Sequence, residues 1–338
     1  MKNNFKGKHG PLLIAEIGGN HEGNFEYAKK LTELAISTDV DYVKFQLYTG
    51  DTLVSKVESP VRNEHFKKFE LTKQQHRELA KMITDAGIGY MASIWDENMF
   101  DWVDEFMPIY KVGSGDLTAL SVLKSIAKKN KPIIISSGLA TEDEVLHTID
   151  FLQSVNQTYK NPEALAVLQC TSMYPINKSD ANLSVIDKFK KITGLTVGYS
   201  DHTEGLDALK YAYAMGAEVL EFHFTDSREG KEFRDHKVSL IPSEVKVLID
   251  EIKLINTLKG TNDKKPLQIE IENEHHISFR RAVYPKQDLK AGSVLTEDNL
   301  ICLRPLHGID AREYYSILGK TLTKDVKEHE KLSWDILK

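Results

Sequence analysis

Two histidines stand at the ends of consecutive apolar runs in the sequence. His202 follows "LTVGYS" (195–200), and His223 lies near the end of "VLEFHF" (219–224). If these runs are adjacent strands of one sheet, the imidazoles can meet, and two imidazoles with open positions suit a divalent transition metal such as Mn²⁺. In the alternative interpretation, His202 caps the following helix and His223 packs inside its strand. The spacing alone is compatible with both.

Lysines and serines stand near the ends of other apolar runs. Lys111, Ser114 and Ser136, with Lys44 nearby, predict an anion pocket, because lysine supplies charge to a phosphate while hydroxyls and loop amides donate hydrogen bonds. Serines that cap helices and lysines that extend into water are the alternative for any one residue. Lys44 differs, because strand alternation points it inward, where a cation needs a partner.

Two carboxylates share the inward face with these cations. Glu16 follows Leu12 and Ile14 at alternate positions, and Glu221 precedes His223 by two residues. Either glutamate could act as a general acid or base, and either could be only a counter-ion to Lys44.

The elements that must position these residues are short β-rich runs that alternate with amphipathic runs. The predicted strands are 12–18, 42–46, 89–95, 109–114, 132–138, 165–170, 195–200 and 219–224. Capping boxes that begin at Thr72 and Thr141 predict two of the intervening helices. Eight such repeats predict a (β/α)₈ TIM barrel, whose active site lies at the C-terminal ends of the strands. An open doubly wound sheet is the alternative, but no Gly-rich dinucleotide fingerprint follows the first strand.

The pattern changes after the predicted barrel. We expect the barrel to span residues 1–260 and a polar linker to span 261–276. Short β runs and a Gly turn then predict a small, mostly β second domain over 277–338.

Composition restricts the class of protein. The chain has 338 residues, of which 41% are hydrophobic and 28% charged, as in a soluble globular protein. A net charge of −6 without a basic block argues against nucleic acid as the main partner. Only two cysteines, Cys170 and Cys302, indicate a reducing compartment, and neither a signal peptide nor a membrane span is evident. We therefore expect a cytoplasmic protein that does not bind membranes.

The motifs together resemble one family. "AEIGGNHEG", "VKFQ", "YKVGSGD", "ISSGLAT", "QCTSMYP", "GYSDHT", "LEFHF" and "DHKVSL" resemble the sialic acid (N-acetylneuraminate) synthases, and "DLKAGSVLTEDNLICLRP" resembles their antifreeze-like (SAF) domain. The resemblance spans nearly the whole chain. It implies a TIM barrel that condenses phosphoenolpyruvate with N-acetylmannosamine or a related amino sugar. It also implies a divalent metal, Mn²⁺ or Mg²⁺, and a homodimer in which the small domain of one chain covers the partner's barrel.

The resemblance also implies roles for individual residues. His202 and His223 match the metal ligands, Glu16 the acid/base glutamate, and Glu221 a second active-site carboxylate. The residues that match phosphoenolpyruvate contacts are Lys44, Lys111, Ser114 and Ser136. Ser93, also expected to bind substrate, stands where the family often has Thr. Those that match sugar contacts are Gln46, Tyr174, Asp235 and Arg304, the last reaching across from the partner chain.

The sequence departs from the family pattern at three places. Phe222 replaces a basic residue before the second metal histidine, and strand parity points it away from the site. Phe233 and Arg234 replace Gly-Pro before Asp-His, which bears on the loop shape and on sugar specificity. Ser172 stands where relatives often have Asn.

Two further functions compete with a sialic acid synthase. A legionaminic or pseudaminic acid synthase would catalyse the same reaction on another sugar. Pseudaminic-type members tend to lack the Asp-His pair, so Asp235 and His236 favour a sialic or legionaminic acid synthase. A non-catalytic carbohydrate- or ice-binding protein would use the C-terminal domain. That alternative leaves the inward-pointing Lys44 and Glu16 unexplained.

Overall fold

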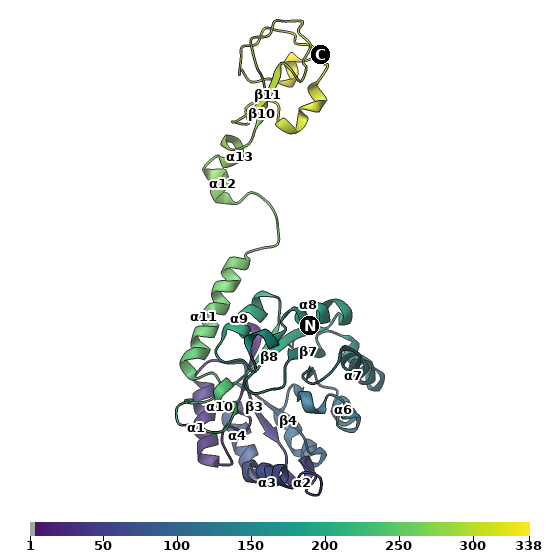
Figure 1. Ribbon diagram of the computed structural model, residues 1–338, viewed down its shortest axis with the longest axis vertical. Coiled ribbons are helices and arrows are strands. Elements are labelled where there is room, and N and C mark those ends of the chain that lie inside the picture. Colours follow the sequence, from purple (N-terminus) through teal and green to yellow (C-terminus); the bar gives the residue numbers. More distant parts are fainter. Residues whose placement is uncertain (1–3) are drawn as a thin grey trace. The chain divides into compact units, whose positions relative to one another are not determined.

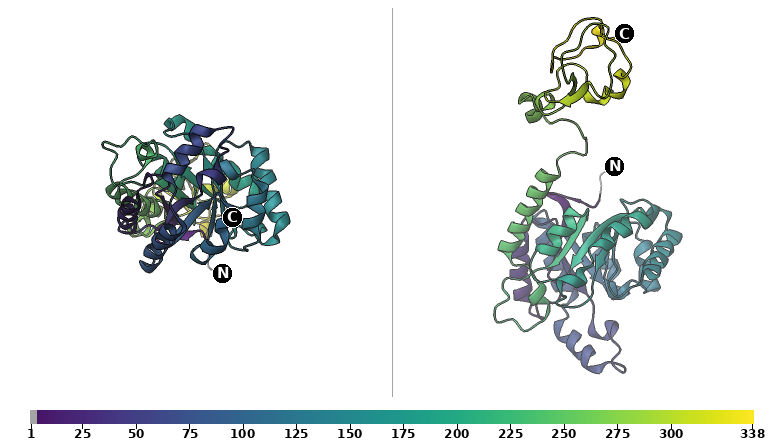
Figure 2. Two further views of the ribbon diagram at one scale, coloured as in Figure 1. Left: turned by 90° about the horizontal axis from the view of Figure 1, so that it is seen from below. Right: turned by 45° about the horizontal axis from the view of Figure 1, so that its top comes forward.

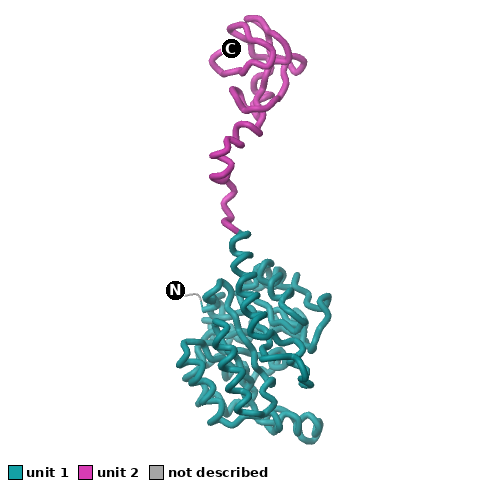
Figure 3. Tube along the Cα trace, turned by 90° about the vertical axis from the view of Figure 1, so that its left-hand side faces the viewer, with its two compact units in different colours: residues 1–259 teal, residues 260–338 magenta. Residues whose placement is uncertain are grey.

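The protein consists of two compact units. The computed structural model describes residues 4–338, and the first unit ends at Lys259 while the second spans Gly260–Lys338 (Figure 3). Each unit has its own cluster of buried apolar side chains.

The first unit is a closed barrel of eight parallel strands. The strands are β2 (Gly10–Glu16), β3 (Tyr42–Leu47), β4 (Gly89–Ile94), β5 (Tyr110–Val112), β6 (Ile133–Ser136), β7 (Leu165–Cys170), β8 (Thr196–Asp201) and β9 (Val219–His223). They pair in sequence order, and β2 also pairs with β9, which closes the sheet on itself. A short strand, β1 (Lys6–Gly7), pairs antiparallel with β2. The predicted TIM barrel is therefore confirmed, and the doubly wound sheet is excluded.

Side chains alternate between the inside and the outside of the barrel, as the strand pattern predicts. The inward side chains form a small apolar core, made of Leu12, Ile14, Met91, Ile109, Ile134, Ala166, Leu168 and Val219 with Phe5 and the half-buried Tyr42. On β9 the opposite face carries Leu220 and Phe222, which belong to the cluster shared with the helices. The prediction that Phe222 points away from the barrel interior is confirmed.

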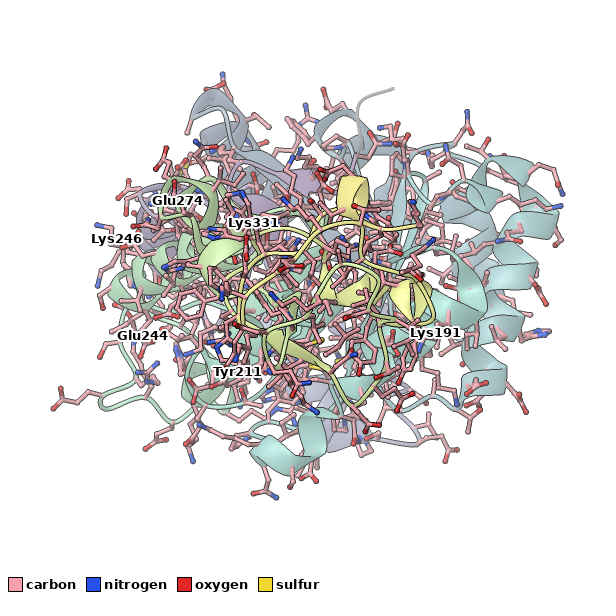
Figure 4. The ribbon with its side chains drawn as sticks, turned by 90° about the horizontal axis from the view of Figure 1, so that it is seen from above. Lys191, Tyr211, Glu244, Lys246, Glu274 and Lys331 are labelled. Carbon is pink, nitrogen blue, oxygen red and sulfur yellow. The ribbon has the colours of Figure 1, made fainter. Side chains whose placement is uncertain are left out.

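Helices connect the strands and cover the outside of the barrel (Figure 1). They are α1 (Phe25–Ile36), α2 (Gly50–Leu53), α3 (Pro60–Phe69), α4 (Lys73–Asp85), α5 (Phe100–Val103), α6 (Leu120–Ala127), α7 (Glu142–Val155), α8 (Ser184–Thr193), α9 (Asp207–Ala214), α10 (Asp235–Val238) and α11 (Pro242–Lys259). Both predicted capping boxes are present, at Thr72 and Thr141. Exposed charged side chains, such as Lys246 on α11, point to solvent (Figure 4).

The connection between β3 and β4 departs from a simple repeat of one strand and one helix. It holds α2 and α3 in addition to α4, and these two short helices lie at one end of the barrel unit (Figure 2). Asn63 ties them together, since its buried amide donates to the carbonyl oxygens of Gly50 and Val54 at 2.8 and 2.7 Å. This hairpin supplies cavity-lining residues that the barrel repeat does not predict.

The second unit contains the small domain and the segment before it. β10 (Ala282–Pro285) pairs antiparallel with β11 (Leu300–Leu303), and isolated bridges such as Leu289–Val326 extend the β structure. The polar linker expected at 261–276 is not entirely irregular, because it holds α12 (Gln268–Glu272) and the start of α13 (His275–Ser278). Local hydrogen bonds explain α12: Glu270 accepts from the Leu267 amide at 2.7 Å.

Over the described residues 4–338, none of the helices combines the length and the apolar character needed to cross a bilayer.

Gly198 on β8 lies where the barrel has no space for a side chain. A Cβ there would clash with the backbone oxygen of Val219 and the side chain of Leu168. We expect Gly198→Ala to destabilise the barrel by about 1–3 kcal/mol, the usual cost of overpacking. Thermal unfolding followed by circular dichroism measures this change. Gly115→Ala is the control, because nothing lies within 4 Å of the added atom; an equal loss in both variants would contradict the explanation.

Candidate active site

One cavity of about 640 Å³ opens at the C-terminal ends of the barrel strands. All the site residues predicted within the barrel line it: Glu16, Lys44, Gln46, Ser93, Lys111, Ser114, Ser136, Tyr174, His202, Glu221, His223 and Asp235. Arg304 belongs to the second unit, where its guanidinium carbon lies 5.2 Å from the ring centroid of Phe279. The structure thus brings together side chains that are more than 200 positions apart in the sequence.

Strand register aligns these residues. Glu16 on β2 is level with Lys44 on β3 and with His223 on β9. Two residues further along the strands, Ser93 on β4 is level with Lys111 on β5. The polar side chains therefore stand directly above the apolar core inside the barrel, and no intervening layer screens them from one another.

Four buried charged side chains form the floor of the cavity, which we call the charge array: Glu16, Lys44, Lys111 and Glu221. The Lys44 Nζ atom lies 2.6 Å from Glu16 Oε2 and 3.9 Å from Glu221 Oε1. The Lys111 Nζ atom lies 3.5 Å from Glu221 Oε2. Lys44 points into the barrel, as predicted, and Glu16 is the partner that its buried charge requires. Because buried ions lose their hydration, each of these charges depends on the others.

The pKa values of the two glutamates in the charge array shift in opposite directions. Burial raises the pKa of Glu16, and the nearby Glu221 carboxylate adds to the effect against the opposing charge of Lys44. Burial also acts to raise the pKa of Glu221, but Lys111 and Lys44 together outweigh it and lower that pKa. Glu221 therefore remains ionised between two lysines, while Glu16 is the carboxylate that can exchange a proton.

Hydroxyl groups surround the two lysines. Lys111 donates to Ser136 Oγ at 2.7 Å, and Lys44 donates to Ser93 Oγ at 3.3 Å. The backbone N–H of Gly138 donates to Ser114 Oγ at 3.0 Å. Ammonium groups beside hydroxyls and loop amides are the donor set that binds phosphate and carboxylate oxygens.

The two histidines meet at the neighbouring ends of β8 and β9. Their ring centroids are 5.3 Å apart, and both side chains are buried. Burial lowers the pKa of each, so both rings are neutral near pH 7. His202 Nδ1 lies 2.7 Å from the Thr171 carbonyl oxygen, which can only accept; this nitrogen therefore carries the proton and leaves Nε2 with a free lone pair.

This pair fits a divalent metal. His223 Nδ1 is buried without a hydrogen-bond partner, and such an orphaned nitrogen is a ready ligand. Neutral imidazoles oriented by a carbonyl are typical of metal-binding histidines. Among residues 4–338 no cluster of three or more His, Cys, Asp or Glu has metal-ligand spacing, so two histidines would leave the other positions to water or substrate.

Further residues extend the site beyond the histidines. The Tyr174 ring lies 4.0 Å from the His202 ring, and the Arg234 guanidinium carbon is 4.7 Å from the Tyr174 ring centroid. Asp235 Oδ2 lies 3.9 Å from His223 Nδ1, and burial raises the pKa of this aspartate.

Several cavity-lining residues were not predicted from the sequence. Ser200 donates to Glu221 Oε1 at 3.2 Å, and strand parity on β8 could have identified it. The others lie mainly outside the strands: Tyr48, Val61, Arg62, His65, Phe66, Phe69, Trp95, Cys170, Glu232 and Phe233. For the residues of α3, no sequence signal indicates that they approach the barrel, whereas the motif resemblance had connected the loop before α10 with sugar specificity.

Comparison with protein-family models gives two matches. The model of the NeuB family matches residues 31–264, and that of the SAF domain matches residues 280–338.

Known proteins resemble this chain over most of its length. N,N'-diacetyllegionaminic acid synthase of Campylobacter jejuni is 35% identical over 332 residues, which cover 94% of this chain and 98% of that protein. Human N-acetylneuraminate-9-phosphate synthase is 30% identical over 345 residues, covering 98% and 94%. The crystal structure of N-acetylneuraminic acid synthetase from Leptospira borgpetersenii, in complex with citrate, has a TM-score of 0.71 and 28% identity and covers 78% of this chain and 90% of that chain. The chain therefore belongs to the NeuB family, that of the sialic acid synthases, and carries an SAF domain at its C-terminal end.

Proposed function

We propose that this protein condenses phosphoenolpyruvate with N-acetylmannosamine or a related N-acetylated amino sugar, giving a nine-carbon 2-keto acid and phosphate. The observation that carries the proposal is the charge array beside two neutral histidines in one cavity. The names of the relatives support an enzyme that makes a sugar acid. A legionaminic acid synthase is the second candidate, because two such synthases are among the relatives, at 35% and 34% identity.

The charge array and its hydroxyls are suited to phosphoenolpyruvate, which carries a phosphate and a carboxylate. Lys44 and Lys111 are already balanced by glutamates, so a polyanion can enter at low cost only if positive charge is released. Glu16 provides this release, because its raised pKa lets it take up a proton and free Lys44 for the anion. Ser93, Ser114 and Ser136 then supply hydrogen bonds to its oxygens.

The histidine pair would position the acceptor. His202 and His223 would hold the metal, which supplies Lewis-acid polarisation of the sugar aldehyde when bound. Tyr174, whose ring is tilted by 43° against that of His202, and Gln46, which donates to Glu16 Oε1 at 3.0 Å, border the space left for the sugar.

The bond changes require one proton carrier. The methylene carbon of phosphoenolpyruvate forms a bond to the aldehyde carbon, water adds to the carbon that bears the phosphate, and phosphate leaves by C–O cleavage. The oxygen of the attacking water becomes the keto oxygen, so the water loses two protons: one replaces the proton that the new hydroxyl gains, and the other leaves with the phosphate. Glu16 is the carboxylate suited to this exchange, because burial holds its pKa above the usual range. Glu221 stays ionised and stabilises the positive charge that develops on the pyruvyl carbon.

The expected assembly is a homodimer in which Arg304 of one chain contacts the sugar bound in the partner's barrel. Such an exchange would put residues of two chains into each site.

Metal dependence is the first test. We expect phosphate release to stop after chelation, to return with Mn²⁺, and to be lost in His202→Ala and His223→Ala, because two ligands hold the ion. A steady-state phosphate assay and calorimetric Mn²⁺ titration measure both effects. His147→Ala, at an exposed position on α7, is the control. Full activity after chelation, or in either ligand variant, would show that the metal assignment is wrong.

Lys44 tests the anion pocket. We expect Lys44→Met to raise the KM for phosphoenolpyruvate about tenfold to a hundredfold, since a charge-assisted hydrogen bond contributes roughly 1.5–3 kcal/mol. The fold should survive, because Glu16 can become neutral when its partner is lost. Lys81→Met, at an exposed position on α4, is the matched control. Unchanged KM and kcat in Lys44→Met would rule out this pocket.

Mixed dimers test whether Arg304 acts in the partner's site. We expect Arg304→Ala and Glu16→Ala each to be nearly inactive. Their mixture should regain about a quarter of wild-type activity, because about half of the re-associated dimers are mixed and one of the two sites in each mixed dimer is intact. Phosphate release after re-association, with native mass spectrometry to count mixed dimers, measures this gain.

The control distinguishes exchange from a site within one chain. Wild type mixed with the double variant Glu16→Ala/Arg304→Ala should form inactive mixed dimers if the sites are exchanged, and half-active ones if they are not. No gain in the first mixture together with half-active dimers in the second would refute the exchange.

A further inference from the structure

The two strands that close the barrel, β2 and β9, are each followed by a loop, and these two loops are bonded to each other. The loop after β2 contains Asn20 and Glu22. The segment after β9 runs from Thr225 to α10, which carries Asp235 and His236. All of these side chains are buried except that of Glu22, which is 41% exposed. Polar groups buried in this way need partners inside the protein.

His236 makes the first tie between the two loops. Its Nε2 atom lies 3.2 Å from Glu22 Oε1, and its Nδ1 atom lies 2.7 Å from Thr225 Oγ1. Burial lowers the pKa of His236 and outweighs the opposing effect of the Glu22 carboxylate, so the ring is neutral near pH 7. Because an ionised carboxylate can only accept, Nε2 carries the proton and Nδ1 accepts from the Thr225 hydroxyl. Both ring nitrogens therefore take part in the bridge.

Asn20 makes the second tie. Its side-chain amide donates to the Phe224 carbonyl oxygen at 2.9 Å and to Ser239 Oγ at 2.8 Å. The Ser239 hydroxyl in turn donates to the carbonyl oxygen of Asp235 at 2.7 Å. The backbone of Asp235 is therefore fixed from two sides, by its bonded partner Ser239 and by its chain neighbour His236.

The carboxylate of Asp235 takes its position from this backbone. Its Oδ2 atom lies 3.9 Å from His223 Nδ1, and its Oδ1 atom is buried without a hydrogen-bond partner, 3.4 Å from Arg234 Nε. The helix α10 has only four residues, and so short a helix is not stable by itself. The place of this carboxylate in the cavity therefore depends on the ties between the two loops.

We propose that His236 is a positioning residue, whose bridge between the two loops fixes the Asp235 carboxylate in the cavity. Its role in turnover rests on the proposed condensation reaction, whereas the bridge itself can be tested without turnover. Lys44 and Lys111 lie on strands, so phosphoenolpyruvate should bind as before when the bridge is lost.

Hydrogen exchange followed by mass spectrometry tests the bridge. His236→Phe keeps a buried ring but makes neither hydrogen bond, and we expect it to speed amide exchange in residues 224–240 by about tenfold or more, with the other barrel strands unchanged. Glu22→Ala breaks the same bridge from its exposed end, leaves the buried ring in place, and should give the same change.

His76→Phe is the matched control for the loss of a buried histidine. His76 lies on α4, and its Nδ1 atom has no hydrogen-bond partner, so this variant should leave exchange in residues 224–240 as in wild type. Wild-type exchange of these residues in both His236→Phe and Glu22→Ala would overturn the inference.

Steady-state phosphate release tests the positioning. We expect His236→Phe to lower kcat/KM for N-acetylmannosamine by roughly tenfold to a hundredfold, because a small displacement of a group in an active site has effects of this size. The KM for phosphoenolpyruvate and the calorimetric affinity for Mn²⁺ should match wild type. His236→Gln, which can still donate to Glu22, should recover most of the loss, and His76→Phe should show none.

A double-mutant cycle tests whether His236 acts through Asp235. If it does, His236→Phe should have little further effect in the Asp235→Ala background, because the group that it positions is already absent. An equal fold-loss in both backgrounds, or wild-type kcat/KM in His236→Phe, would overturn the inference and leave the condensation standing. If wild type releases no phosphate with N-acetylmannosamine or a related N-acetylated amino sugar, the proposed function fails and the positioning role fails with it, while hydrogen exchange still decides on the bridge.

Discussion

Four buried charges at the C-terminal end of the barrel are the constraint on which the rest of the site depends. Glu16, Lys44, Lys111 and Glu221 are removed from water together, so the charge of each is stabilised mainly by the others. The surroundings of the two carboxylates differ, and their pKa values therefore shift in opposite directions. Glu221 lies between two ammonium groups and stays ionised, while burial leaves Glu16 able to exchange a proton. In the proposed reaction the array would combine anion binding with acid–base chemistry.

Barrel closure makes that array possible. The pairing of β2 with β9 sets Glu16 level with His223, although the two are separated by almost the whole length of the barrel sequence. Parallel register does the same for Lys44 beside Glu16. Below them the barrel interior is filled by aliphatic side chains, and this packing prevents the strands from sliding by one residue, which would turn every polar side chain outward.

The cavity is lined by residues of two kinds of element. Residues at the strand ends, each on a strand paired with two neighbours, form the polar floor. The outer wall comes from α3 and from the loop before α10, elements that can vary without disturbing the barrel.

The sequence by itself determined the barrel, because alternating apolar runs and capping boxes are local signals, and strand parity pointed Lys44 and Glu16 inward. Motif resemblance then assigned roles to residues at the strand ends. Only the tertiary structure decided which charges pair, since the distances from Lys44 to Glu16 and Glu221 depend on register between strands far apart in the chain. It also decided that Phe69 and Phe233 meet. Their contact joins the end of helix α3 to the loop before α10, and no local pattern encodes this meeting, because it follows from the packing of the finished barrel.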